Sequence, residues 1–329
     1  MKKLVSIAVL LMLMTAPSGM AAEDDAGYAG AFLYIPIGAR PAAMGGAYLA
    51  VSDDGAGAMY NPAGLSNIKR TLFGTSYRVM TLDRILGYAT VIVPTKGQSA
   101  LGVHWLYAGD KGLKARDDRG VIIPGFDISK NDHEISIVFA KRFEKIFSAG
   151  LKMNYLQSSF VGMSAFGVGF DLGGMFYLSE LFDRNTRDLM AIQDIRAGIT
   201  VKYLGAEYRW NNENYVGPKV PNQTGGTVQK DKVPVEFGLG GSARFFDRKL
   251  LLATDILKNT KQSPFFHAGA EYTLHPKLAL RGGFSAGRLT AGTGFIFEVG
   301  DRTIAVDYAF STDKVDEGSE HIFSFDFLF

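Results

Sequence analysis

Hydrophobic and polar residues alternate along most of the chain with a period of two residues. The cleanest stretch is 303–310, where every second residue is Ile, Val, Tyr or Phe, and residues 195–203 repeat the pattern. Such alternation is typical of β-strands that have one apolar and one polar face. It occurs in soluble β-sandwiches and in membrane barrels alike, so periodicity alone leaves both folds open.

The lengths of the connections favour the membrane barrel. We expect fourteen strands, at residues 71–80, 84–93, 99–109, 131–141, 147–158, 165–177, 195–204, 233–245, 250–257, 265–273, 278–285, 290–299, 303–310 and 320–329. Connectors after even-numbered strands are mostly tight turns, whereas 110–130, 205–232 and 311–319 are longer and polar. Bacterial outer-membrane barrels have an even strand number, short periplasmic turns and longer outer loops. We therefore predict an all-β, transmembrane antiparallel β-barrel over residues 71–329.

The N-terminus has the features of a secretory signal peptide. Lys2 and Lys3 precede an apolar run from Leu4 to Met14, and small residues follow up to a predicted cleavage near Ala21. The run is too short for a transmembrane helix, which needs ~20 residues. We expect residues 1–21 to be removed on export, and we expect the mature chain to reside in a bacterial outer membrane.

The last strand carries a regular series of aromatic residues. Phe325, Phe327 and Phe329 share one face, and the sequence ends on Phe329. This resembles the C-terminal signal by which the barrel-assembly machinery recognises outer-membrane barrels. That machinery and the outer-membrane lipid are therefore expected partners.

Composition excludes several functional classes. The formal net charge is only +2, which argues against a nucleic-acid partner. With no Cys, the chain has neither disulfides nor Cys-ligated metal sites. The five His residues form no i, i+4 pair, and no nucleophile elbow or phosphate loop occurs. We expect a protein that is not an enzyme and has no metal or other cofactor.

The polar faces of the strands carry charges that a lumen would have to accommodate. We expect a lumenal polar network built from Lys152, Asp171, Arg196, Lys202, Glu236, Glu271, Arg281, Glu298 and Asp307. Glycines are expected on the same faces, at positions 87, 102, 167, 169, 198, 238, 240, 269, 283, 292 and 294. They either leave room for an internal segment or relieve barrel curvature, and both interpretations stay open.

Residues 22–70 differ from the strands and are predicted to form a plug or hatch inside the barrel. From Gly38 to Gly64, 14 of 27 residues are Gly or Ala, which suits close packing against a wall but not an independent core. The motif residues singled out for the plug are Arg40, Met44, Gly45, Gly46, Asp53, Asp54, Asn61 and Pro62.

Local chemistry suggests roles for parts of this segment. Arg40 needs an acidic partner, which Asp53, Asp54, Glu298 or Asp307 would provide. Turn or cap chemistry at Asp53 and Asp54 is preferred over a metal site. The apolar residues Phe32, Tyr34 and Ile35 either pack on the inner wall or line a hydrophobic passage.

The segment from Arg40 through Met44-Gly45-Gly46 and Asp53-Asp54 to Asn61-Pro62 resembles the N-terminal signature of the PorV/PorQ family, relatives of the FadL long-chain fatty-acid transporters. The resemblance implies a fourteen-stranded barrel with an N-terminal plug. It implies either passage of hydrophobic small molecules or a role in type IX secretion, in which the barrel binds and shuttles secreted cargo proteins. The chain is shorter than typical FadL transporters, whose long ligand-capturing surface loops it need not share.

Overall fold

The computed structural model describes residues 27–81, 83–110, 113–127, 129–182, 192–211, 229–285, 287–312 and 318–329. The signal peptide predicted for residues 1–21 lies outside these ranges.

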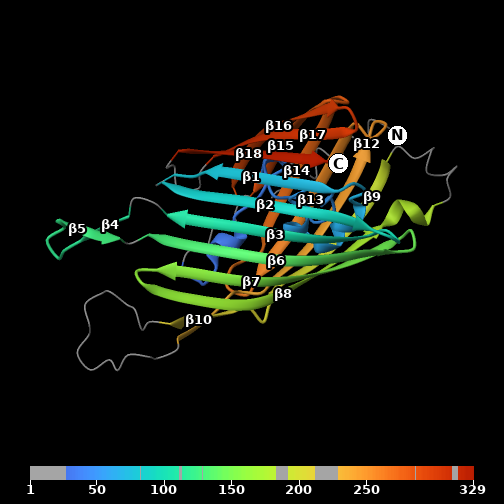
Figure 1. Ribbon diagram of the computed structural model, residues 1–329. Helices are drawn as coiled ribbons and strands as arrows, with labels where there is room; N and C mark the ends of the chain where they lie inside the picture. Colours follow the sequence, from blue (N-terminus) through green and yellow to red (C-terminus); the bar gives the residue numbers. More distant parts are fainter. Residues whose placement is uncertain are drawn as a thin grey trace.

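Fourteen antiparallel strands close into one barrel, which confirms the predicted fold (Figure 1). Each strand pairs with its neighbours along the chain, and the last pairs with the first, Leu72 opposite Leu328. A closed ladder pairs every strand with two neighbours, which is the condition for a sheet to cross lipid. The strands are β1 (Leu72–Val79), β2 (Arg84–Thr95), β3 (Ser99–Asp110), β6 (Lys130–Phe143), β7 (Phe147–Phe160), β8 (Met163–Tyr177), β9 (Ile192–Leu204), β12 (Glu236–Phe245), β13 (Leu250–Asn259), β14 (Phe265–His275), β15 (Leu278–Ser285), β16 (Arg288–Val299), β17 (Arg302–Thr312) and β18 (Ser319–Leu328).

Two predicted loops contain additional short strands. β4 (Lys114–Arg116) and β5 (Ile122–Asp127) form a hairpin that projects from the barrel (Figure 1). β10 (Glu207–Asn211) pairs with β8 and with β11 (Gln229–Lys232). These strands are three to six residues long, too short for alternation to distinguish them from polar loop.

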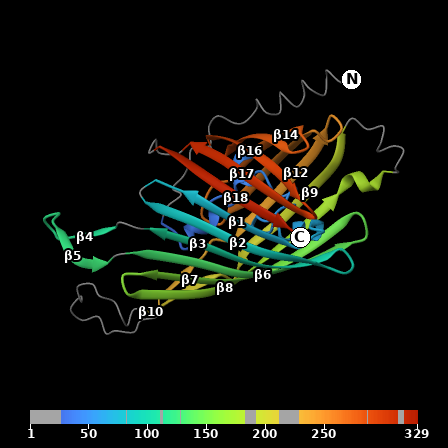
Figure 2. The same cartoon turned by 45° about the horizontal axis from the view of Figure 1, so that its top comes forward.

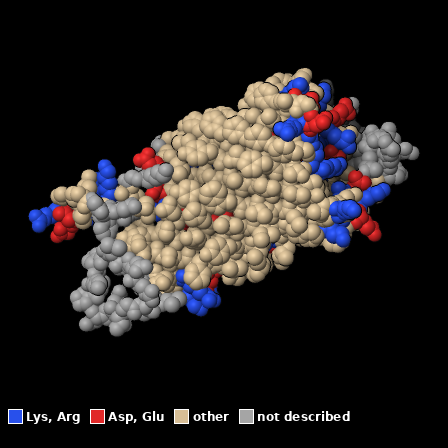
Figure 3. Space-filling model, in the orientation of Figure 1, with Lys and Arg blue, Asp and Glu red and all other residues tan. Residues whose placement is uncertain are grey.

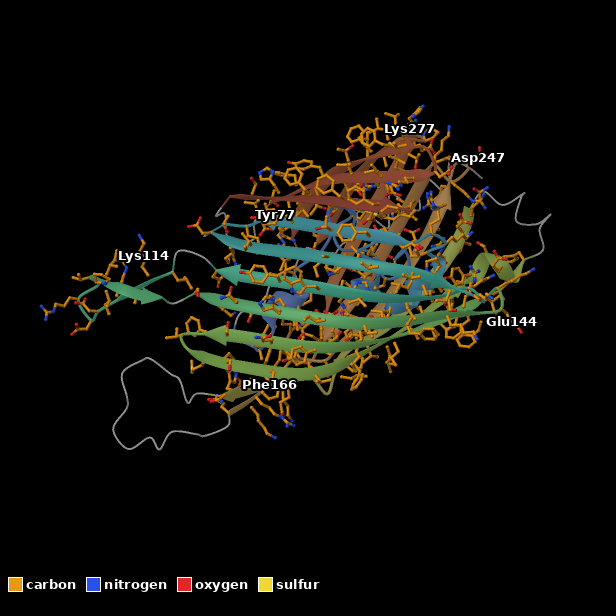
Figure 4. The ribbon with its side chains drawn as sticks, in the orientation of Figure 1. Tyr77, Lys114, Glu144, Phe166, Asp247 and Lys277 are labelled. Atoms are coloured by element: carbon orange, nitrogen blue, oxygen red, sulfur yellow. The ribbon has the colours of Figure 1, made fainter. Side chains whose placement is uncertain are left out.

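The connectors define two ends of the barrel. We call the end with connectors 96–98, 144–146, 246–249 and 276–277 the turn end, and the opposite end, with β4 and β5, the loop end. Figure 4 shows Glu144, Asp247 and Lys277 at the turn end and Lys114 at the loop end. A short 3₁₀ helix, η3 (Leu178–Leu181), follows β8 at the turn end.

The outer surface of the barrel is apolar between its two ends. Alternate residues of β3 point outward, and Leu101, Val103 and Trp105 are each about half exposed. On the face seen in Figure 3, charged side chains gather at the two ends and leave a broad uncharged band between them. A continuous apolar exterior of this extent requires a lipid environment. In the part of the chain that the structure describes, no helix is long and apolar enough to cross a membrane.

The N-terminal segment, residues 27–70, lies inside the barrel (Figure 2). It contains η1 (Ala31–Tyr34), α2 (Ala39–Ala43), α3 (Gly57–Tyr60) and η2 (Pro62–Asn67). Nearly every residue between 38 and 66 is buried. Helices this short have little stability alone, so contacts with the wall hold the segment in place.

Wall glycines allow this close approach. A Cβ atom on Gly150 would lie 2.3 Å from the carbonyl carbon of Pro62, and one on Gly283 would lie 2.2 Å from the backbone nitrogen of Gly45. Both distances are inside van der Waals contact, so a larger residue at either position would displace the segment. The structure thus supports the interpretation that strand glycines make room for an internal segment.

One glycine assignment was wrong. Gly87 faces outward, whereas its neighbours Leu86 and Tyr88 point into the barrel and are 3% and 4% exposed. Here the inner face is as apolar as the outer one, because it packs against the N-terminal segment. Hydrophobicity therefore does not reveal which face of β2 points inward.

Candidate functional site

Arg40 joins the N-terminal segment to the barrel wall. Its Nε and Nη2 donate to the two carboxylate oxygens of Glu271 on β14, at 2.7 and 3.0 Å. Its Nη1 lies 2.6 Å from Asp53 Oδ1 and 3.5 Å from Asp54 Oδ2. The paired geometry with Glu271 is the bidentate arrangement that guanidinium favours. From the sequence Asp53 and Asp54 were named as partners, but the wall partner is Glu271 rather than Glu298 or Asp307.

The network continues along the wall from Glu271. Arg281 Nε donates to Glu271 Oε2 at 2.8 Å, and Arg281 Nη1 donates to Asp307 Oδ1 at 2.5 Å. On the other side, Arg196 Nη1 lies 3.8 Å from Asp53 Oδ2. Four of the nine charges predicted for the lumen belong to this network: Arg196, Glu271, Arg281 and Asp307. Four more form the separate pairs Lys202–Glu236 and Lys152–Asp171.

Glu298 was wrongly assigned to this network. It is exposed, next to the last residue of β16 at the turn end. There the strand extends beyond the N-terminal segment, so the side chain reaches water instead of a buried cation.

The pKa values of the two aspartates beside Arg40 shift in opposite directions. Burial raises the pKa of Asp53, but the charges of Arg40 and Arg196 outweigh this effect and bring its pKa below the usual value. Burial also raises the pKa of Asp54, and there the charge of Arg40 does not offset it, so the pKa stays above the usual value. Tyr48 links Arg40 to Asp54, because its hydroxyl accepts from Arg40 at 2.7 Å and donates to Asp54 at 2.6 Å.

A second group of buried charges lies on β6, β7 and β8. Lys152 Nζ is 2.5 Å from Glu134 Oε1 and 3.3 Å from Asp171 Oδ2, and all three side chains are buried. Lys202 on β9 pairs separately with Glu236 on β12, at 2.7 Å. Glu134 was not singled out in the sequence, although it occupies a polar position in an alternating strand.

Backbone groups of the N-terminal segment are also held by the wall. Asp255 Oδ2 accepts from the backbone nitrogens of Tyr48 and Leu49, at 2.6 and 2.8 Å. His267 Nδ1 lies 2.6 Å from Gly45 O. Gly45 and Gly46 have φ values of 64° and 81°, a region that favours glycine, and Met44 beside them is fully buried. The motif residues Met44, Gly45 and Gly46 are thus packed closely against the barrel wall.

Asn61 and Pro62 fix the chain direction after α3. Asn61 Oδ1 accepts from Ala63 N at 3.0 Å and caps η2, in which Pro62 is the first residue. The Asn61 amide donates to Gly174 O on β8, at 3.0 Å. Asparagine serves here as a cap and as a link to the wall.

A cavity of about 410 Å³ opens between the N-terminal segment and the loop end. Its floor comes from the segment and includes the three residues predicted to pack on the wall or line a passage, Phe32, Tyr34 and Ile35. Phe32 lines the cavity and is also packed in the main core, 7% exposed. Charged residues of the strand ends complete the wall of the cavity. Its volume is within the range of small-molecule sites.

Tyr203, which the sequence did not indicate, supports this floor. Its hydroxyl donates to Leu33 O at 3.0 Å, and its ring meets the Tyr34 ring edge to face, with centroids 5.3 Å apart. Its backbone has a φ of 61°, which turns the chain inward at the end of β9. Among the described residues, no group of three or more His, Asp or Glu is placed to hold a metal ion.

These features define a class of molecule: a fourteen-stranded, outer-membrane type of barrel with an internal N-terminal segment. Solved structures with this fold include the Pseudomonas putida toluene transporter TodX, with a TM-score of 0.57 and 14% identity over 87% of this chain and 95% of that chain. The CymD monoaromatic hydrocarbon channel gives 0.57 and 14% over 89% and 96%. A Pseudomonas aeruginosa FadL homologue gives 0.56 and 13% over 89% and 98%.

No family model and no curated protein matches the sequence. At 13–14% identity, the structural likeness establishes the fold alone. The neighbours are transporters and channels of the FadL and TodX type, not enzymes. They do not support the assignment to the PorV family that the N-terminal motif suggested.

Proposed function

We propose that this protein passes hydrophobic small molecules across a bacterial outer membrane. The observation that carries the proposal is the cavity at the loop end, whose floor is an apolar part of a segment that fills the barrel beneath it. A molecule from the outer surface would enter this cavity first. Two structural neighbours, a toluene transporter and a monoaromatic hydrocarbon channel, support the same class of substrate.

In this proposal the N-terminal segment is the plug. Its two parts are held differently. Residues 38–66 have the ionic and backbone links to the wall. Residues 27–37, which contribute to the cavity floor, are held by core packing of Phe32, Leu33 and Ile37 and by single hydrogen bonds such as Tyr203 to Leu33. Passage requires a shift of the segment, because its buried residues occupy the lumen between the cavity and the turn end.

A disulfide lock tests this shift. The backbone nitrogen of Ala39 donates to Ser324 Oγ on β18 at 2.7 Å, so the two residues are in direct contact and are the positions chosen for a cross-link. The chain has no Cys of its own, which removes competing thiols. We expect an oxidised Ala39→Cys/Ser324→Cys variant to lose uptake of labelled toluene by whole cells and to regain it on reduction.

Three comparisons complete the experiment. Each single Cys variant, treated with the same oxidant, should take up toluene like the unmodified protein. Uptake that persists in the oxidised double variant would show that the segment does not move there. Uptake by the unmodified protein no greater than that of cells with an empty vector would overturn the transport function itself.

The aromatic C-terminus has a separate role in this proposal. Phe325 and Phe329 point outward from β18 and its end, 37% and 54% exposed, and Phe327 packs beside Phe73 with ring centroids 6.1 Å apart. We propose that this strand is the barrel-assembly signal. Phe329→Ser should reduce the folded, heat-modifiable fraction in the outer membrane, whereas the same variant refolded in detergent should form the barrel normally.

A further inference from the structure

The cavity at the loop end combines two kinds of lining that a pure hydrocarbon would not need together. One is a series of aromatic rings from the N-terminal segment, and the other is a set of buried ion pairs from the strands. The inference drawn from this combination concerns which molecules the cavity favours, and it rests on the proposed function.

The aromatic side presents rings instead of hydroxyl groups. Tyr28 and Tyr34 meet edge to face with centroids 5.5 Å apart. Their hydroxyls are already engaged, Tyr28 with Gln262 at 3.2 Å and Tyr34 with the backbone oxygen of Pro234. The Tyr60 hydroxyl donates to Ile37 O at 2.9 Å. The ring faces and edges are therefore what these residues offer a ligand, and aromatic rings pack well against them.

The polar side of the cavity includes two buried ion pairs. Lys202 and Glu236 pair at 2.7 Å, with side chains 9% and 7% exposed. Arg78 and Glu320 form a second buried pair, whose side chains are 3% and 4% exposed. All four residues line the cavity. Lys202 also donates to the backbone oxygen of Met59, at 3.4 Å, so this pair lies directly beside the N-terminal segment.

Paired charges set two conditions on a ligand. A hydrocarbon that displaces water from them offers no hydrogen bond in return, and a buried polar group without a partner is costly. An ionised ligand at either of these two pairs would have to compete with the pair, because each of the four charges already has its counter-charge. A neutral hydroxyl meets both conditions, since it accepts from a cation or donates to a carboxylate without breaking the pair.

We propose that this cavity selects neutral aromatic molecules that carry a hydrogen-bonding group, such as phenols or aromatic alcohols, over plain aromatic hydrocarbons and over aromatic carboxylates. Sites built to bond a hydroxyl discriminate strongly against the analogue that lacks it.

Calorimetric titration of the full-length protein in detergent tests the proposal with three molecules of one ring each: toluene, benzyl alcohol and benzoate. Benzyl alcohol should bind more tightly than toluene, although water holds the alcohol more strongly, and about tenfold more tightly than benzoate. Equal or tighter binding of toluene, or of benzoate, would overturn the proposal. Cyclohexylmethanol should bind less tightly than benzyl alcohol, and equal binding would refute the aromatic preference.

A double variant locates the preference. Lys202→Met/Glu236→Met removes both charges together and leaves neither unpaired, and it should shift the benzyl alcohol to toluene ratio about tenfold toward toluene. The matched control, Lys152→Met/Glu134→Met/Asp171→Asn, removes a buried group of charges that does not line the cavity and should leave the ratio unchanged. If the first variant does not fold, the ligand series on the unmodified protein still decides the question.

Failure of selectivity and failure of transport give different results. The expected binding order without any uptake of toluene or benzyl alcohol by cells would leave the selectivity intact and refute the transport function. Uptake of both compounds with toluene bound more tightly would do the reverse.

Discussion

Replacing Arg40 by Met should release the N-terminal segment from the wall. The substitution keeps a long apolar side chain but removes the cation that joins Glu271 of β14 to Asp53 and Asp54 of the segment. Three carboxylates then share one buried region with fewer positive charges. The expected result is a segment that leaves the wall more often while the barrel itself stays folded.

The size of the effect follows from the surroundings of Arg40. Removing one partner of a buried ion pair costs about 3–5 kcal/mol. The Arg40 side chain is 14% exposed, and Arg281 remains 2.8 Å from Glu271, so that carboxylate keeps one cation. We therefore expect the lower end of the range, about 3 kcal/mol, which is roughly a hundredfold in the equilibrium between docked and undocked segment.

Hydrogen exchange followed by mass spectrometry measures this equilibrium directly. In Arg40→Met, amides of residues 38–66 should exchange roughly a hundredfold faster, with strand amides unchanged. Arg40→Lys keeps the charge but loses the bidentate geometry, so its exchange should be intermediate. Unchanged exchange of the segment in Arg40→Met would refute the reasoning, and equal acceleration in the strands would show a loss of global stability instead.

Three further results are expected. Gly150→Val should lower the free energy of unfolding by about 1–3 kcal/mol in urea titrations, because the new side chain meets the backbone of the N-terminal segment. The control is Gly87→Val, where nothing lies within 4 Å of a Cβ atom, and it should change the free energy of unfolding by less than about 0.5 kcal/mol. Val103→Arg places a charge on the outward face of β3 and should lower the free energy of unfolding in lipid vesicles by about 2–4 kcal/mol. An Arg introduced at an outward position near either end of the barrel should lower it much less. At pH 7, Asp53→Asn should lower the free energy of unfolding by about 2 kcal/mol and Asp54→Asn by much less. The reason is that the native protein lowers the pKa of the Asp53 carboxyl and raises that of Asp54. Equal losses of stability in thermal unfolding would contradict this difference.

Much of the barrel followed from local pattern. Alternation located all fourteen strands, with most ends within three residues of those in the structure. The pattern succeeds because every second side chain of a strand faces lipid, which requires apolar residues irrespective of what fills the lumen. It fails at β2, where both faces are apolar, and Gly87 was placed on the wrong side for that reason.

The candidate site was predicted only in part. The chemistry of Arg40 required an acid, and two of its three partners lie within fourteen residues of it in the chain. Glu271 lies 231 residues away, and its choice over Asp307 or Glu298 depends on which strand curves past the segment. Register also decides that Lys202 faces Glu236, whereas Lys152 contacts Glu134 and Asp171.

The sequence by itself determined the strands, the lipid-facing sides of those other than β2, and the Gly- and Ala-rich character of the N-terminal segment, because each depends on the spacing of neighbouring residues. Only the tertiary structure decided which carboxylate Arg40 binds, where the cavity opens and which aromatic rings line it. These depend on closure of the sheet, which brings side chains from opposite parts of the chain around one interior.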